Sequence, residues 1–163
     1  ERFGQSAGEI LARYPQACVV VIGLRRSQVY AKAIADAVPA DRFIDFTGQT
    51  ASLREVMALL SLGSLLITND SGPAHLASLT DIPAVTLFGP ETPALYGPVG
   101  EKAVMLYAYY SCSPCLSAHN HRYTLCRDNK CMQAISVERV VQECVKILGA
   151  VPSSGRNITG ARA

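Results

Sequence analysis

The sequence is poor in charged residues and contains no long apolar run. Only 17% of its 163 residues are Asp, Glu, Lys or Arg, and the formal net charge is +2. Because neither sign forms a long block, the chain offers no basic patch, and we expect no nucleic-acid partner. No run reaches the roughly 18 to 20 apolar residues that a membrane-spanning helix needs, so we expect no transmembrane segment.

The first residues also lack the features of a secretion signal. Residues 1–15, ERFGQSAGEILARYP, have neither a basic start nor a continuous apolar core. We therefore expect a cytoplasmic, reducing setting, in which disulfides are rare. A hydrophobic content of 49% is enough for one globular core, which we place in residues 1–150. The polar residues 151–163 are expected to form a disordered tail.

Strand-like and helix-like apolar patterns alternate along the chain. Short β-branched or alternating runs predict strands at residues 18–23, 42–48, 64–70, 84–89 and 102–108. Apolar stripes predict helices at residues 5–14, 28–38, 52–62, 72–80 and from Ser136 onward. Ser52 and Glu55 have the spacing of a capping box at the start of the third helix. This alternation favours an α/β fold in which a parallel sheet has helices on both faces.

In such sheets, ligands bind beyond the carboxyl ends of the strands, and the residues that follow Ile67 and Thr68 suit this role. Pro73 fits a first helical turn, and Gly72 permits close approach of a ligand. The helix start and the Ser71 hydroxyl favour an anion such as phosphate. The Asp70 carboxylate would repel phosphate and suits the hydroxyl groups of a sugar.

Each of these features also has an ordinary structural explanation. Asp and Ser are common helix N-caps, and proline often follows a cap. His75 is either a ligand contact or a packed structural histidine. Residues 88–98, FGPETPALYGP, include Gly89, Pro90 and Thr92, and three prolines make this loop stiff. A stiff loop presents backbone groups with little loss of entropy, but it is also simply a turn-rich connection.

The sequence contains six cysteines, in two groups. Cys18 and Cys144 lie in apolar patterns and are expected to be small core residues. The others lie in a Cys-rich loop, residues 111–132, at positions Cys112, Cys115, Cys126 and Cys131. Their spacing is compatible with a metal ion, with disulfides or with free thiols. A bound metal such as zinc would be structural, since four thiolates close its coordination shell.

The stretch ITNDSGPAHLASLTDIPAVTLFGPETPALYGP resembles the C-terminal signature of glycosyltransferase family 9. These proteins are heptosyltransferases that build the inner core of lipopolysaccharide. The resemblance continues upstream through FIDFTGQTASLREVMALLSLGSLLITND and downstream into CSPC and CMQAISVERVV. It covers about residues 1–149, which is most of the chain.

The resemblance implies the C-terminal half of a GT-B fold, in which two Rossmann-like halves enclose the active site. This half would bind a nucleotide-diphosphate sugar, typically ADP-heptose. The other half would bind the acceptor, a lipopolysaccharide core or another glycan, and would carry the catalytic carboxylate. The implied catalytic residues therefore lie outside this sequence, and we expect the chain alone to be inactive. The acceptor would bring the enzyme to the inner face of the inner membrane by peripheral association.

The resemblance also assigns roles to individual residues. Asp70 would contact the donor sugar, while Ser71 and Gly72 would hold the diphosphate. The remaining members of the implied donor-binding set are Pro73, His75, Gly89, Pro90 and Thr92. No divalent metal is expected for catalysis, because a helix start can stabilise the leaving diphosphate.

The sequence departs from the family pattern at two places. Family members usually have a strand and a basic, tryptophan-containing segment just before the residues with which this sequence begins. We therefore expect the sheet to lack an interior strand unless that strand lies outside this sequence or another chain supplies it. After Gly23, some relatives carry an acidic residue suited to ribose hydroxyls, whereas this chain has Arg25 and Arg26. The resemblance thus leaves the nucleotide base open.

Two other functions compete with a transferase. A sugar-nucleotide epimerase or hydrolase of the same fold would require acid and base residues that this sequence does not display. A non-catalytic interaction domain stapled by the cysteine cluster would require no catalytic residues at all. Binding of a nucleotide-diphosphate sugar distinguishes the first two functions from the third.

Overall fold

The computed structural model describes residues 1–150, so the tail predicted at residues 151–163 lies outside the described residues. The strands are β1 (Val19–Val21), β2 (Phe43–Asp45), β3 (Leu66–Asn69), β4 (Ala84–Phe88) and β5 (Ala103–Tyr107). The helices are α1 (Arg2–Arg13), α2 (Gln28–Ala35), α3 (Leu53–Leu62), α4 (Gly72–Ala77), α5 (Pro93–Tyr96), α6 (Lys130–Gln133) and α7 (Val137–Ala150). Each predicted strand and helix is present, and the short helices α5 and α6 were not predicted.

All strand pairs are parallel, but the strands form two sheets rather than one. β1 pairs with β2, and β3, β4 and β5 form a second sheet in that order. In residues 1–150 no strand pairs with the second edge of β1 or of β3. This division agrees with the expectation that an interior strand would be lacking. Ile22 and Leu66 pack against the same buried cluster, so the end of β1 lies on the side of β3.

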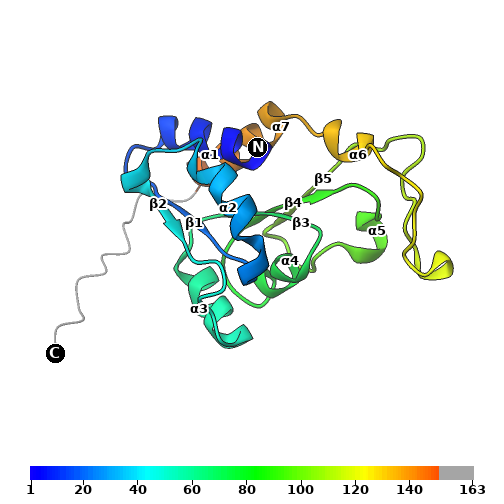
Figure 1. The fold of residues 1–163 in the computed structure, drawn as a ribbon, viewed down its shortest axis with the longest axis horizontal. Helices are drawn as coiled ribbons and strands as arrows, with labels where there is room; N and C mark the ends of the chain where they lie inside the picture. The colour runs from blue at the N-terminus through cyan, green and yellow to red at the C-terminus, as the bar shows by residue number, and fades with distance from the viewer. Residues whose placement is uncertain (151–163) are drawn as a thin grey trace.

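Helices cover both faces of the larger sheet (Figure 1). On one face, Val85 and Leu87 join a buried cluster with Ile10 of α1 and Cys144 of α7. On the other face, Ala84 joins a smaller cluster with Leu60 of α3 and Ala77 of α4. This alternation is expected, because successive side chains of a strand point to opposite faces. The predicted α/β arrangement is therefore confirmed.

Strand β4 is the centre of the core, because each of its residues is buried. A strand covered on both faces reads as a continuous apolar run, as AVTLF does. Cys144 is fully buried, as predicted, but Cys18 is exposed and the core prediction for it is wrong. Cys18 directly precedes β1, and this strand belongs to the smaller sheet, whose residues are only half-buried or exposed.

The predicted cap of α3 is present in a shifted form. The Ser52 hydroxyl accepts a hydrogen bond from the backbone N–H of Glu55 at 3.3 Å. The Glu55 carboxylate, in return, accepts from the N–H of Ala51 at 2.8 Å instead of that of Ser52. The cap therefore satisfies two backbone N–H groups at the helix start. One of them belongs to Ala51, which is one residue before the N–H group that the capping-box motif uses. Among residues 1–150, none of the helices combines the length and apolarity required to cross a membrane.

Removing a core side chain from β5 should destabilise the domain. Leu106 is 3% exposed and belongs to the larger cluster. We expect Leu106→Ala to lower the free energy of unfolding by about 2–5 kcal/mol, because it leaves a cavity in a close-packed core. Chemical denaturation measures the loss, and Val99→Ala, at an exposed position, is the control. Equal effects of the two substitutions would contradict this description of the core.

Candidate functional site

The pairing of β3 with β4 brings two predicted loops together at the carboxyl edge of the larger sheet. Asn69 lies opposite Leu87, and the next N–H, that of Asp70, donates to the Leu87 carbonyl at 3.0 Å. The Asp70–Pro73 turn and the loop from Gly89 to Thr92 therefore leave the sheet side by side. The loop after Gly23 leaves from the smaller sheet.

The start of α4 has no side-chain cap. Ser71 occupies the N-cap position, but its hydroxyl donates to the Asn69 carbonyl at 3.1 Å and lies 3.2 Å from the Thr68 hydroxyl. Pro73 lies in the first turn, as predicted, and α4 ends at Ala77, earlier than predicted. The interpretation of Ser71 as an ordinary capping side chain is therefore not supported.

Gly72 is exposed, and a Cβ atom at this position would meet nothing within 4 Å. Packing within the described chain therefore does not explain a glycine here. Open space beside the backbone at the start of α4 is what the close approach of a ligand requires. This observation is consistent with the predicted role of Gly72, and no contact within the chain competes with it.

Asp70 is half-buried beside this turn. Burial raises the pKa of the Asp70 carboxyl, and the charges of His75 and Arg122 oppose that shift. His75 is exposed and lies close enough to Asp70 to lower the pKa of the Asp70 carboxyl. Asp70 and His75 therefore share one small site, in which the cation Arg122 was not predicted.

The loop after β4 shows structural roles for its predicted residues. Gly89 is buried, and a Cβ atom there would lie 2.5 Å from Sδ of Met132, so any larger residue would have to displace the Met132 side chain. The Pro90 carbonyl accepts hydrogen bonds from the N–H groups of Cys115 and Leu116 at 2.8 and 3.0 Å. The Thr92 hydroxyl caps α5 by accepting from the N–H of Ala94 at 3.3 Å. Donor contacts of Gly89, Pro90 and Thr92 stay predictions.

The four loop cysteines are neighbours, but they do not form a closed metal site. Burial raises the pKa of the Cys131 thiol, with smaller contributions from Cys115, Cys112 and Cys126. All are free cysteines, and in residues 1–150 no group of three or more His, Cys, Asp or Glu side chains is arranged to hold a metal ion. The structure thus gives no support to zinc or disulfides at this cluster, and both stay predictions.

Sequence patterns missed two charged residues of this site. Glu91 is buried, and neither of its carboxylate oxygens has a hydrogen bond. Arg122, from the Cys-rich loop, places Nη1 3.5 Å from Oε1 of Glu91 and its guanidinium 4.9 Å from the centre of the Tyr96 ring. Glu91 lies inside the candidate loop at residues 88–98. In contrast, nothing in the residues around Arg122 predicts that its side chain contacts Glu91.

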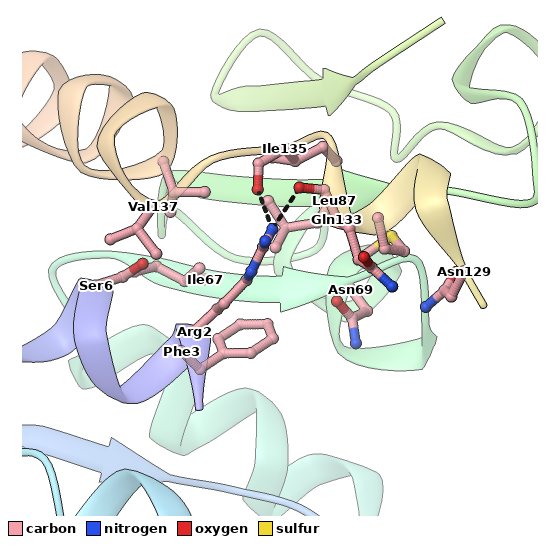
Figure 2. Close-up of a pocket in the computed structure, with 12 residues that line it drawn as sticks. Arg2, Phe3, Ser6, Ile67, Asn69, Leu87, Asn129, Gln133, Ile135 and Val137 are labelled. Carbon is pink, nitrogen blue, oxygen red and sulfur yellow. Dashed lines mark hydrogen bonds between the residues drawn. The ribbon is translucent and has the colours of Figure 1, made fainter. Parts of the chain in front are cut away.

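A cavity of about 250 Å³ lies next to the end of β3. Figure 2 shows Arg2 and Phe3 of α1 below, Ile67 and Asn69 of β3 across the middle of the view, and Ile135 in the link between α6 and α7 above. Arg2 Nη1 donates to the carbonyls of Gln133 and Ile135 at 2.6 and 3.0 Å. These bonds tie the start of α1 to the residues that directly follow the Cys-rich loop.

The fold matches one half of solved glycosyltransferases of the GT-B class. The glycosyl transferase family 9 structure from Veillonella parvula superposes with a TM-score of 0.73 and 26% identity, covering 92% of this chain and 41% of that one. The E. coli ADP-heptose lps heptosyltransferase II superposes with a TM-score of 0.71 and 20% identity, covering 90% of this chain and 40% of that one. The partial coverage fits a half domain of this class.

The sequence assigns the family. Residues 10–124 match glycosyltransferase family 9 (heptosyltransferase), and the chain belongs to this family. It is 31% identical to the lipooligosaccharide heptosyltransferase 2 of Campylobacter jejuni over 85 residues, which are 52% of this chain and 25% of that protein. It is 35% identical to the lipopolysaccharide heptosyltransferase 1 of Pseudomonas aeruginosa over 65 residues, which are 40% of this chain and 18% of that protein. The aligned residues thus span a quarter or less of these two relatives.

The two glycines of the site should respond differently to an added methyl group. We expect Gly89→Ala to destabilise the domain by roughly 1 kcal/mol, because its Cβ overlaps Met132, whose flexible side chain gives way only in part. Gly72→Ala is the matched control and should leave stability unchanged or slightly raised, because its Cβ meets open space in a helix. Thermal denaturation of both variants checks this, and a larger loss at Gly72 would show that the turn is packed differently.

Proposed function

We propose that this chain is the donor-binding half of an inverting glycosyltransferase that acts in lipopolysaccharide core biosynthesis. The proposed donor is a nucleotide-diphosphate sugar, ADP-heptose. The observation that carries this proposal is the uncapped start of α4 beside Asp70, at the carboxyl edge of a sheet in a family 9 domain. Two E. coli proteins that share this fold support the choice of donor, the ADP-heptose lps heptosyltransferase II and the heptosyltransferase WaaC, whose structure was solved with ADP.

Two kinds of group in the site would bind the two parts of the donor. The backbone at Ser71 and Gly72 would receive the diphosphate, because exposed N–H groups at a helix start attract anions. The Asp70 carboxylate would accept hydrogen bonds from sugar hydroxyls, which are donors that a carboxylate can bind. Pro73 fixes the turn between them, and His75 lies beside Asp70. The proposed donor would therefore have its sugar at Asp70 and its diphosphate at the start of α4.

In the proposed reaction, a hydroxyl of the acceptor attacks the anomeric carbon of the donor. A general base removes the hydroxyl proton, and the bond from the anomeric carbon to the diphosphate oxygen breaks. The turn at Ser71 and Gly72 would stabilise the leaving nucleotide diphosphate without a metal ion. The base and the acceptor site would lie on the other half of the enzyme. A lipopolysaccharide core acceptor would place this reaction at the inner face of the cytoplasmic membrane.

Nucleotide titration tests the proposal directly. We expect the full-length protein to bind ADP and ADP-heptose, as measured by calorimetry, and to bind a UDP-sugar more weakly. Residues 1–163 alone should transfer no sugar, because the proposed base and acceptor site are absent from them. Failure to bind any of these nucleotides would instead favour a non-catalytic interaction domain, and sugar transfer by the chain alone would contradict the half-site arrangement.

The charge of Asp70 should matter for the sugar and not for the diphosphate. We expect Asp70→Asn to weaken ADP-heptose binding about tenfold or more, the usual effect of losing a hydrogen bond to a charged group. Binding of ADP should be unchanged or slightly stronger, since a carboxylate repels phosphate.

The pH dependence of binding follows from the same carboxylate. Burial raises the Asp70 pKa above the ordinary value of 3.8, so the carboxylate is protonated at a higher pH than an exposed aspartate. ADP-heptose affinity should therefore fall on acidification, and the fall should begin at a higher pH than the titration of an ordinary aspartate would cause. Asp70→Asn should abolish this fall. Calorimetry over a pH series measures it, and an identical acid limb in the variant would assign the titration to another group.

A further inference from the structure

The part of the Cys-rich loop that carries Arg122 is built in a defined shape. Ser117 and Asn120 form a reciprocal capping box around the short helix η3 (Ala118–Asn120). The Asn120 amide donates to the Cys115 carbonyl, and the Arg122 N–H donates to the Ser117 carbonyl, both at 2.9 Å. These bonds hold His121 and Arg122 in the left-handed region, with φ of 54° and 55°. Strained backbone that is over-determined in this way tends to occur at functional sites.

The same loop is fastened to the turn after β4. The Pro90 carbonyl receives the two N–H groups of Cys115 and Leu116. The Ser113 hydroxyl donates to the Gly89 carbonyl and accepts from the Tyr107 hydroxyl at 3.0 Å. Arg122 is thereby delivered to the carboxyl edge of the sheet, next to the loop that contains Glu91.

Glu91 and Arg122 have very different environments. The Glu91 side chain is 6% exposed and makes no hydrogen bond, whereas the Arg122 side chain is 61% exposed. A buried carboxylate is unfavourable unless a charge compensates it, and the Arg122 guanidinium is 3.5 Å away. The Tyr96 ring beneath the guanidinium adds a cation–π contact. Glu91 and Tyr96 therefore hold Arg122 in place while leaving most of its surface open to a ligand.

We propose that Arg122 binds the diphosphate of the nucleotide-sugar donor and that Glu91 positions it. This inference rests on the proposed function, because it names a further contact to the same donor. The diphosphate is the anionic part of such a donor, and Asp70 and Glu91 in this site are both acidic. A guanidinium offers several N–H donors in a planar fork, which suits phosphate oxygens. An exposed arginine that pairs with Glu91 and lies near enough to Asp70 to lower the pKa of its carboxyl supplies the positive charge that a diphosphate needs there.

The test compares two arginines of the same loop in the full-length protein. We expect Arg122→Gln to raise the Kd for ADP about tenfold or more and to reduce its dependence on salt, because a charge-assisted contact is lost. Arg122→Lys should give an intermediate Kd, since it keeps the charge but loses the fork. Arg127→Gln, at an exposed position of the loop, is the control with the same loss of charge and should bind ADP as the wild type does.

The role of Glu91 is tested by coupling. Glu91→Gln should raise the Kd for ADP less than Arg122→Gln, and the double variant should bind no more weakly than Arg122→Gln alone, because both substitutions remove the same contact. Melting temperatures of all variants separate this result from a loss of folding.

Each other outcome overturns the proposal in a recognisable way. If the wild-type protein binds ADP and Arg122→Gln binds it equally well, the Arg122 assignment fails and the proposed function stands. Weaker binding with an unchanged salt dependence would assign Arg122 a structural role, as would additive effects of the two substitutions. If the wild-type protein binds no ADP, both proposals fail.

Discussion

The site depends on the parallel pairing of β3 with β4. This pairing sets Asn69 opposite Leu87 and continues into the bond from the Asp70 N–H to the Leu87 carbonyl. Since β4 is buried along its whole length, its register cannot shift without moving apolar side chains out of both clusters. The position of Asp70 relative to the Gly89 turn is therefore fixed by the core, so the sheet edge at which we propose donor binding is held in shape by packing elsewhere in the domain.

The Cys-rich loop belongs to this edge as much as the two turns do. Its N–H groups satisfy the Pro90 carbonyl, its Met132 fills the space above Gly89, and its Arg122 approaches the buried Glu91. The loop thus contributes backbone order, packing and charge to one small region. Whatever the state of its thiols, a change in the loop would be transmitted to the turn after β4 through these contacts.

Local patterns predicted the elements and the first half of the site, and they failed where contacts are distant in sequence. The β-branched runs located β3 and β4, and the strand-to-helix turn identified Asp70 and Gly72, because each signal lies within a few residues. The prediction that Cys18 is a core residue was wrong, since its apolar neighbours do not indicate that β1 would belong to a sheet of only two strands. The side chain of Arg122 meets Glu91 across 31 residues, and only the folded loop reveals that contact. The division into two sheets follows from strand neighbours, which no run of residues encodes by itself.

The two sheets also differ in how they contribute to cooperativity. Both buried clusters draw their fully buried members from the larger sheet, the helices and the loops around it, and in residues 1–150 neither β1 nor β2 supplies one. Local opening of β1 and β2 would therefore remove no fully buried member of either cluster, whereas opening of β4 would require unfolding of the whole unit. The loop after Gly23 belongs to the less stable layer. A ligand that contacted this loop together with the Asp70 turn would couple the two layers. Ordering of the smaller sheet would then reduce the observed binding free energy.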